Sequence, residues 1–151
     1  IACEEVALPP DLRARKITNP DAPKNNHCIK VSAGGEESWA IPIIYSSSEK
    51  YDVRRGGPFF NYLQFQMLLV ERGNNSPTPS VKVHLKDGKA ALVGIDQVTG
   101  FYEQVGRNTG YIIHPEEILA DNFALLVLDK RDVPTPAVLE KIEAIVKGSD
   151  R

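Results

Sequence analysis

Apolar and polar residues alternate through the middle of the chain with the period of β-strands. Every second residue of segment 62–70 is apolar, which predicts a half-buried strand: Leu63, Phe65, Met67 and Leu69. The alternation returns in 81–85, and Asp87-Gly88 then predicts a hairpin turn into 90–95. Together these segments predict an antiparallel meander. The apolar run 38–45 contains Pro42, which has no backbone N–H and therefore predicts an edge strand.

The C-terminal third changes to the period of helices. A helix is expected from Pro115, with an apolar surface wide enough to bury it: Ile118, Leu119, Phe123, Leu126 and Val127. A second helix is expected to start at Thr135-Pro136 and to end at Gly148. The glycine-punctuated segment 100–110 is interpreted as a connection. The predicted fold class is α+β, an antiparallel β-meander followed by two C-terminal helices.

The first 36 residues lack a clear period. Pro9, Pro10, Pro20 and Pro23 oppose regular structure, so residues 1–36 are predicted to form an extended N-terminal arm. Residues 37–151 are predicted to form a single α+β domain.

Composition is that of an ordinary globular domain. The 151 residues are 42% hydrophobic and 25% charged, which suffices for a hydrophobic core. A formal net charge of -2 argues against a nucleic-acid partner, because phosphate binding needs a basic surface. No apolar run approaches the roughly 20 residues of a transmembrane helix, so we expect no membrane span.

The N-terminal residues bear on localisation. The sequence begins at Ile1 rather than methionine, which leads us to expect that an upstream segment has been removed. Cys3 and Cys28 could form a disulfide in an exported protein, Cys3 could be lipidated, or both thiols could be unpaired. We expect an exported protein, either periplasmic, secreted or lipid-anchored.

The acidic start of the first C-terminal helix is the best candidate for chemistry. Glu117 and Asp121 stand four residues apart and therefore share a helix face. Their repulsion requires a positive partner, such as a metal ion or a metal-bound histidine. His114 immediately precedes Pro115 and could either approach such a site or simply cap the helix. The polar surroundings of His27 and His84 make them weaker candidates.

The segment Glu117-Ile118-Leu119-Ala120-Asp121 resembles the Glu-x-x-x-Asp element of the gluzincin metallopeptidases. The wider segment TGYIIHPEEILADNFALLV is similar to the corresponding part of uncharacterised bacterial members of that group. The resemblance implies that Glu117 is the third zinc ligand. It also implies that Asp121 orients a zinc-bound histidine, and that the substrate is a peptide or protein.

The sequence departs from that family in one important respect. The His-Glu-x-x-His motif, which supplies two ligands and the general base, does not occur in these 151 residues. The chain is therefore expected to be the carboxyl-terminal portion of a longer peptidase, a relative without the catalytic helix, or a partner of a separate chain. Proximity to Glu117 makes Tyr111 and His114 candidate catalytic donors to the scissile carbonyl. The alternative function is a non-enzymatic secreted or lipid-anchored interaction domain.

Overall fold

The computed structural model describes residues 1–18, 23–74 and 78–148. They belong to two compact units, Ile1–Thr99 and Gly100–Arg151, called here the sheet unit and the helical unit. The predicted domain boundary between residues 36 and 37 lies inside a strand, whereas the structure divides the chain after Thr99.

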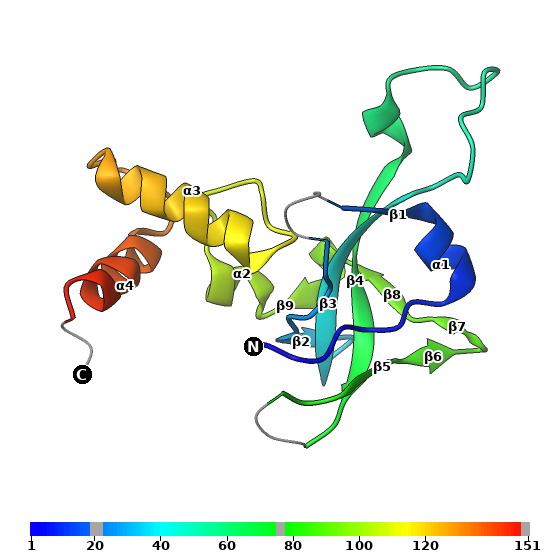
Figure 1. Cartoon of the computed structure of the whole chain (residues 1–151), viewed down its shortest axis with the longest axis horizontal. Coiled ribbons are helices and arrows are strands. Elements are labelled where there is room, and N and C mark those ends of the chain that lie inside the picture. The colour runs from blue at the N-terminus through cyan, green and yellow to red at the C-terminus, as the bar shows by residue number, and fades with distance from the viewer. Residues whose placement is uncertain (19–22, 75–77, 149–151) are drawn as a thin grey trace. The chain divides into compact units, whose positions relative to one another are not determined.

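An antiparallel sheet forms the framework of the sheet unit (Figure 1). Its strands pair in the order β5-β4-β3-β2-β9, while β1 pairs with β3 and β8 pairs with β4. The strands are β1 (Lys16–Ile17), β2 (Ile29–Ala33), β3 (Glu36–Ser46), β4 (Leu63–Arg72), β5 (Val81–Val83), β8 (Leu92–Gly94) and β9 (Val98–Thr99). A separate hairpin consists of β6 (Leu85–Lys86) and β7 (Lys89–Ala90). Two short 3-10 helices are η1 (Phe59–Tyr62) and η2 (Ile95–Gln97).

Strand β3 lies inside the sheet, so the prediction of an edge strand was wrong. Pro42 faces Met67 of β4 on one side. On the other side β2 begins at Ile29 opposite Ala40, and β1 ends at Ile17 opposite Ile44. Pro42 therefore lies at the gap between the pairing with β2 and the pairing with β1. Its missing N–H interrupts neither of them.

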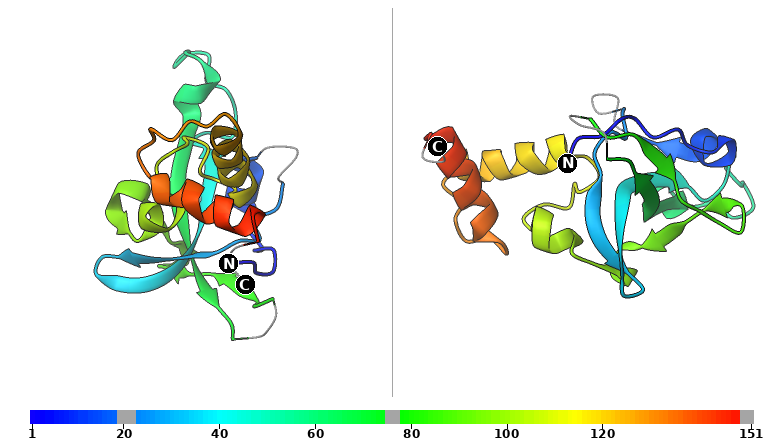
Figure 2. Two further views of the ribbon diagram at one scale, coloured as in Figure 1. Left: turned by 90° about the vertical axis from the view of Figure 1, so that its left-hand side faces the viewer. Right: turned by 90° about the horizontal axis from the view of Figure 1, so that it is seen from below.

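Two tight turns set the register of the hairpins. Gly34 and Gly35, with φ of 60° and 86°, join β2 to β3, which curve together as one ribbon in Figure 2. Asp87 and Gly88, with φ of 52° and 74°, join β6 to β7. Positive φ at both central residues gives a turn whose twist matches that of the paired strands. The predicted Asp87-Gly88 hairpin is confirmed.

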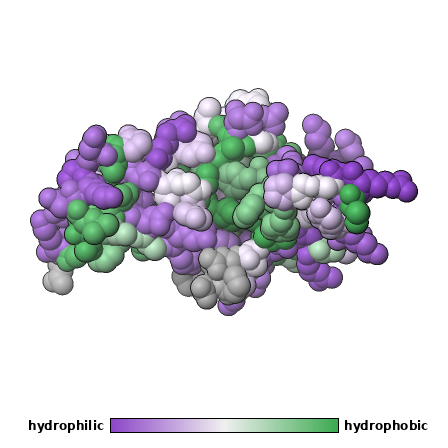
Figure 3. Space-filling view, turned by 90° about the horizontal axis from the view of Figure 1, so that it is seen from above, coloured by the Kyte–Doolittle hydropathy of each residue, from purple (hydrophilic) through white to green (hydrophobic). Residues whose placement is uncertain are grey.

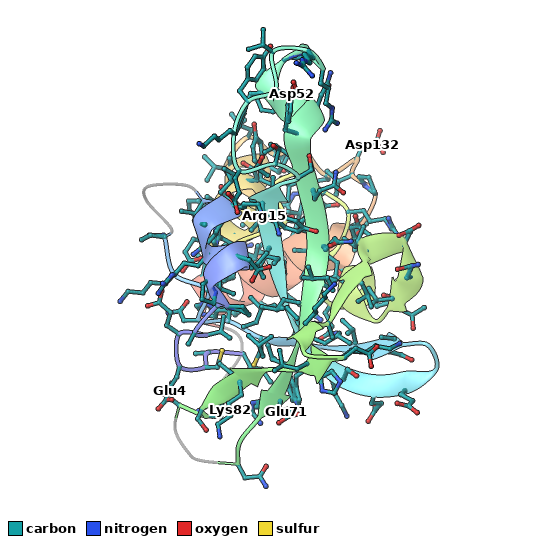
Figure 4. The ribbon with its side chains drawn as sticks, turned by 90° about the vertical axis from the view of Figure 1, so that its right-hand side faces the viewer. Glu4, Arg15, Asp52, Glu71, Lys82 and Asp132 are labelled. Carbon is teal, nitrogen blue, oxygen red and sulfur yellow. The ribbon has the colours of Figure 1, made fainter. Side chains whose placement is uncertain are left out.

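The core of the sheet unit is apolar. Met67 and Leu68 are adjacent in β4 and both 0% exposed, so both faces of the strand are covered at this point. Leu12 reaches the core from helix α1 (Pro10–Arg15). Next to it, the Arg15 guanidinium lies 5.2 Å from the centre of the Tyr45 ring and donates to the Ser46 carbonyl oxygen at 3.1 Å (Figure 4).

Residues 1–36, predicted to form an extended arm, thus include one helix and two strands as well as extended backbone. Pro10 is compatible with α1 because it occupies the first turn, where a missing N–H is tolerated. Pro20 lies outside the described residues.

Three helices make up the described part of the helical unit: α2 (Phe101–Val105), α3 (Pro115–Val127) and α4 (Pro136–Val146). The two C-terminal helices were predicted, and α4 begins after Thr135 as expected. Segment 100–110 is more than a connection, because it contains α2. In the described ranges, no helix has the length and apolar character needed to cross a membrane.

Helix α3 buries only part of the apolar surface predicted for it, because Ile118 and Leu126 are half-buried and the other three predicted residues are exposed. Leu119, Phe123 and Val127 are 55%, 46% and 67% exposed, whereas Asn122 is 0% exposed. Beside them, α4 exposes Ile145 and Val146. A mainly apolar groove of about 530 Å³ lies between the two helices, and green surface is visible on this unit in Figure 3. The buried side of α3 is therefore its amide-bearing side.

Candidate metal-ligand helix

The entry into α3 positions the candidate residues. His114 is the residue before the helix and has extended backbone angles, which suits a residue that precedes proline. Its carbonyl oxygen accepts hydrogen bonds from the N–H groups of Glu117 at 3.1 Å and Ile118 at 3.2 Å. The imidazole of His114 is only 5% exposed. The backbone of His114 thus starts the helix, while its side chain belongs to the interior.

Glu117 and Asp121 share one face of α3, as their spacing predicts. Both side chains are half-buried. The Thr109 hydroxyl donates a hydrogen bond to Oδ2 of Asp121 and accepts one from the N–H of Tyr111 at 3.0 Å. A single hydroxyl therefore holds the Asp121 carboxylate against the loop that leads into the helix.

Tyr111 and His114 occupy contrasting environments. The Tyr111 side chain is 67% exposed, so its hydroxyl can reach a bound molecule. His114 is buried three residues later in the chain. Nearby, the Arg107 guanidinium lies 3.8 Å from the centre of the Tyr102 ring, a cation–π contact that engages both residues within the unit.

A network of amide hydrogen bonds around the buried Asn122 joins the loop to both long helices. Asn108 donates to Oδ1 of Asn122 at 2.9 Å and to the carbonyl oxygen of Thr135 at 2.9 Å. Its own Oδ1 accepts the Thr135 N–H at 2.7 Å. Asn122 in turn donates to the carbonyl oxygen of Ile118 at 2.7 Å. The network fixes the start of α4 against α3.

Sequence reasoning missed the two residues that organise this region, Thr109 and Asn122. Asn122 interrupts the apolar period of α3 between Ile118 and Leu125. A polar residue at such a position indicates either an exposed face or a buried amide with partners. Thr109 carries a weaker signal, a hydroxyl two residues before an exposed tyrosine.

The metal-binding capacity of the described residues is incomplete. In ranges 1–18, 23–74 and 78–148, no group of three or more His, Cys, Asp or Glu side chains is placed to hold a metal ion. His84 pairs with Glu71 through Nδ1 at 3.4 Å, and the Nδ1 atom of His27 lies 2.9 Å from Oδ1 of Asn26. A catalytic zinc needs three protein ligands, so the described residues do not by themselves provide such a site.

A groove in the sheet unit has a volume of about 980 Å³. It is lined by residues of β2, β4 and the β6–β8 region, among them His84, Lys86 and Lys89. None of the four predicted site residues lines it.

Comparisons of the chain with protein-family models, curated proteins and solved structures found no match.

Proposed function

We propose that this chain contributes the third-ligand helix of a zinc-dependent metallopeptidase. Glu117 would be the metal ligand, and Asp121 would orient a ligand histidine supplied from upstream or from another chain. The observation that carries the proposal is the pair of half-buried carboxylates on one face of α3, with Asp121 held by Thr109. The substrate would be a peptide or protein, and the protein would be exported.

The chain's own residues suit this role in two ways. The hydrogen bond from Thr109 restrains Asp121, and a restrained carboxylate can fix the orientation of an imidazole at lower entropic cost. Glu117 is half-buried, so its side chain is partly exposed and partly shielded from water. Zinc held by Glu117 and two histidines would polarise the scissile carbonyl and lower the pKa of bound water.

Tyr111 is the better of the two predicted catalytic donors. Its exposed hydroxyl can approach a carbonyl oxygen, whereas the imidazole of His114 is shielded. In the assembled enzyme, Tyr111→Phe should lower kcat roughly 100-fold, the order of effect seen when one oxyanion donor is removed. Tyr102→Phe is the matched control, since the Tyr102 ring already packs against Arg107. Equal turnover by Tyr111→Phe and the parent enzyme would remove Tyr111 from this role.

The main test is the zinc content of the protein encoded by the complete gene, including any coding region upstream of Ile1. We expect a His-Glu-x-x-His motif in that region or in a co-purifying chain, and one zinc bound with it. Glu117→Gln should abolish stoichiometric zinc binding. Asp121→Asn should weaken it roughly 10- to 100-fold, as for other residues that orient ligands.

Glu116→Gln provides the matched control, because Glu116 is an exposed acid one residue earlier on the same helix. It should retain full zinc content. Full zinc content in Glu117→Gln would contradict the proposal, and so would the absence of the motif from both sources. Either result would favour the non-enzymatic interaction domain.

A further inference from the structure

The two cysteines lie together in the core of the sheet unit although they are far apart in sequence. Cys3 donates its N–H to the carbonyl oxygen of Asn26 at 2.7 Å, and Cys28 donates its N–H to the carbonyl oxygen of Ile1 at 2.9 Å. Between them, residues 2 and 27 form an antiparallel bridge. The first residues of the chain therefore run beside the segment that leads into β2.

Both thiols are inaccessible and in contact. The side chains are 3% and 1% exposed and belong to the same apolar cluster. Burial, followed by the neighbouring Cys28 thiol, raises the pKa of Cys3 to about 12. Both are free thiols in one apolar cluster on adjacent backbone segments, a placement that favours a bond of about 2.05 Å between the two sulfur atoms.

We propose that Cys3 and Cys28 are joined by a structural disulfide in the mature protein. The two thiols would lose two protons and two electrons to an oxidant of the disulfide class, such as oxidised glutathione, which is released as two thiols. A new Sγ–Sγ bond would then link the N-terminal segment to the start of β2. The same burial opposes lipidation of Cys3, because an acyl-bearing group would have to leave the core.

The cross-link would add a covalent restraint to the backbone hydrogen bonds and apolar packing that hold the N-terminal segment. Glu4 donates its N–H to the Pro79 carbonyl oxygen at 2.9 Å, and Val6 donates to that of Asn25 at 3.2 Å. Figure 4 shows Glu4 near the end of the sheet that carries Lys82. A covalent bond at Cys3 would restrict the unfolded chain most between residues 3 and 28, which is the origin of disulfide stabilisation.

Burial also determines when the bond would form. The thiolate is the nucleophile in disulfide exchange, and a raised pKa leaves little of it at neutral pH. Oxidation of the folded protein should therefore be slow, and the bond should form while the chain is still folding. Once formed, the same burial should protect it from reduction.

Refolding tests the proposal directly. Reduced, denatured protein is refolded in a glutathione redox buffer, free thiols are blocked with iodoacetamide, and peptides are mapped without reduction. We expect one intramolecular Cys3–Cys28 bond. We also expect a Tm roughly 10 °C above that of the same protein kept in dithiothreitol.

The double variant Cys3→Ala/Cys28→Ala is the control, and its Tm should not depend on dithiothreitol. Two free thiols per chain after refolding would overturn the proposal. Bonds only between chains, or equal Tm values for oxidised and reduced protein, would also overturn it. The result is independent of zinc, so failure here leaves the proposed function untouched.

Discussion

Strand β4 of the sheet unit and helix α3 of the helical unit bury different kinds of side chain. At the centre of the sheet unit, Leu68 is fully buried within an apolar cluster. On α3 the fully buried side chain is Asn122, while Leu119 and Val127 are more than half exposed. The sheet unit therefore relies mainly on apolar burial, whereas the helical unit combines buried apolar side chains, such as Phe101 and Leu139, with the hydrogen bonds of Asn122.

The largest effect is expected from truncating the apolar core. Leu68→Ala should lower the free energy of unfolding of the sheet unit by about 3 kcal/mol, because it removes buried methyl groups and leaves a cavity. The chain's single tryptophan, Trp39, lies in β3, so its fluorescence during urea denaturation follows this unit. Leu85→Ala is the control, since Leu85 is 55% exposed. Similar losses in the two variants would refute the apolar-core description.

A smaller loss is expected from the amide network. The Thr135 carbonyl oxygen keeps the Val138 N–H as a donor, but Asn108→Ala removes the partners of Asn122 Oδ1 and of the Thr135 N–H. Leaving these groups unsatisfied should cost the helical unit about 2 kcal/mol, measured by circular dichroism at 222 nm during denaturation.

A double-mutant cycle sharpens this second prediction. Asn108→Ala and Asn122→Ala should be non-additive by roughly 1 kcal/mol, because the two amides share a hydrogen bond. Gln104→Ala is the control, since Gln104 is exposed and bonds within its own helix turn. A change below about 0.5 kcal/mol in Asn108→Ala would show that the network contributes little.

The difference between the units also explains which features could be predicted from sequence. Asp87-Gly88 and Thr135-Pro136 act through local backbone geometry, so their neighbours alone were sufficient to predict the hairpin and the start of α4. The period of β4 worked because apolar residues there are buried. The edge-strand prediction from Pro42 was wrong because a missing N–H removes a hydrogen bond only where a neighbouring strand pairs at that position.

The candidate site likewise has one feature that the sequence predicts and others that it does not. The shared face of Glu117 and Asp121 follows from helical spacing and was predictable. The hydrogen bond from Thr109 to Asp121 joins residues twelve apart, and the bonds of Asn108 to Thr135 span 27 residues. The periodic pattern of neighbouring residues cannot reveal contacts between residues so far apart in the sequence. Since they determine which side of α3 is buried, the apolar side was wrongly predicted to face inward.

A surface ion-pair cluster on α4 offers a prediction based on titration. Hydrogen bonds from Arg131 and then Lys147 lower the pKa of Glu143 to about 2. Because this pKa lies below its ordinary value of 4.5, the stabilisation is complete above pH 4.5 and is lost as the pH falls towards 2. Arg131→Gln should move the carboxyl titration, followed by NMR, towards 4.5.

Lys147→Gln should produce a smaller rise, because Lys147 is the lesser of the two causes. An unchanged titration in Arg131→Gln would show that the pair at 2.7 Å does not persist in solution. The effect on stability should be less than that of the core and network variants, since exposed ion pairs contribute little.

The smallest effect is expected on the exposed apolar side of the helical unit. Val146 is 64% exposed at the end of α4, so Val146→Lys should change the free energy of unfolding by less than about 0.5 kcal/mol. Leu139→Ala, in the same helix but at a position that is 1% exposed, should cost about 3 kcal/mol. The free energies of unfolding of both variants are measured by circular dichroism at 222 nm during denaturation. If Val146→Lys were as damaging as Leu139→Ala, the groove between α3 and α4 would have to be covered in solution. The helical unit would then depend on apolar burial as much as the sheet unit does, and the contrast between the two would disappear.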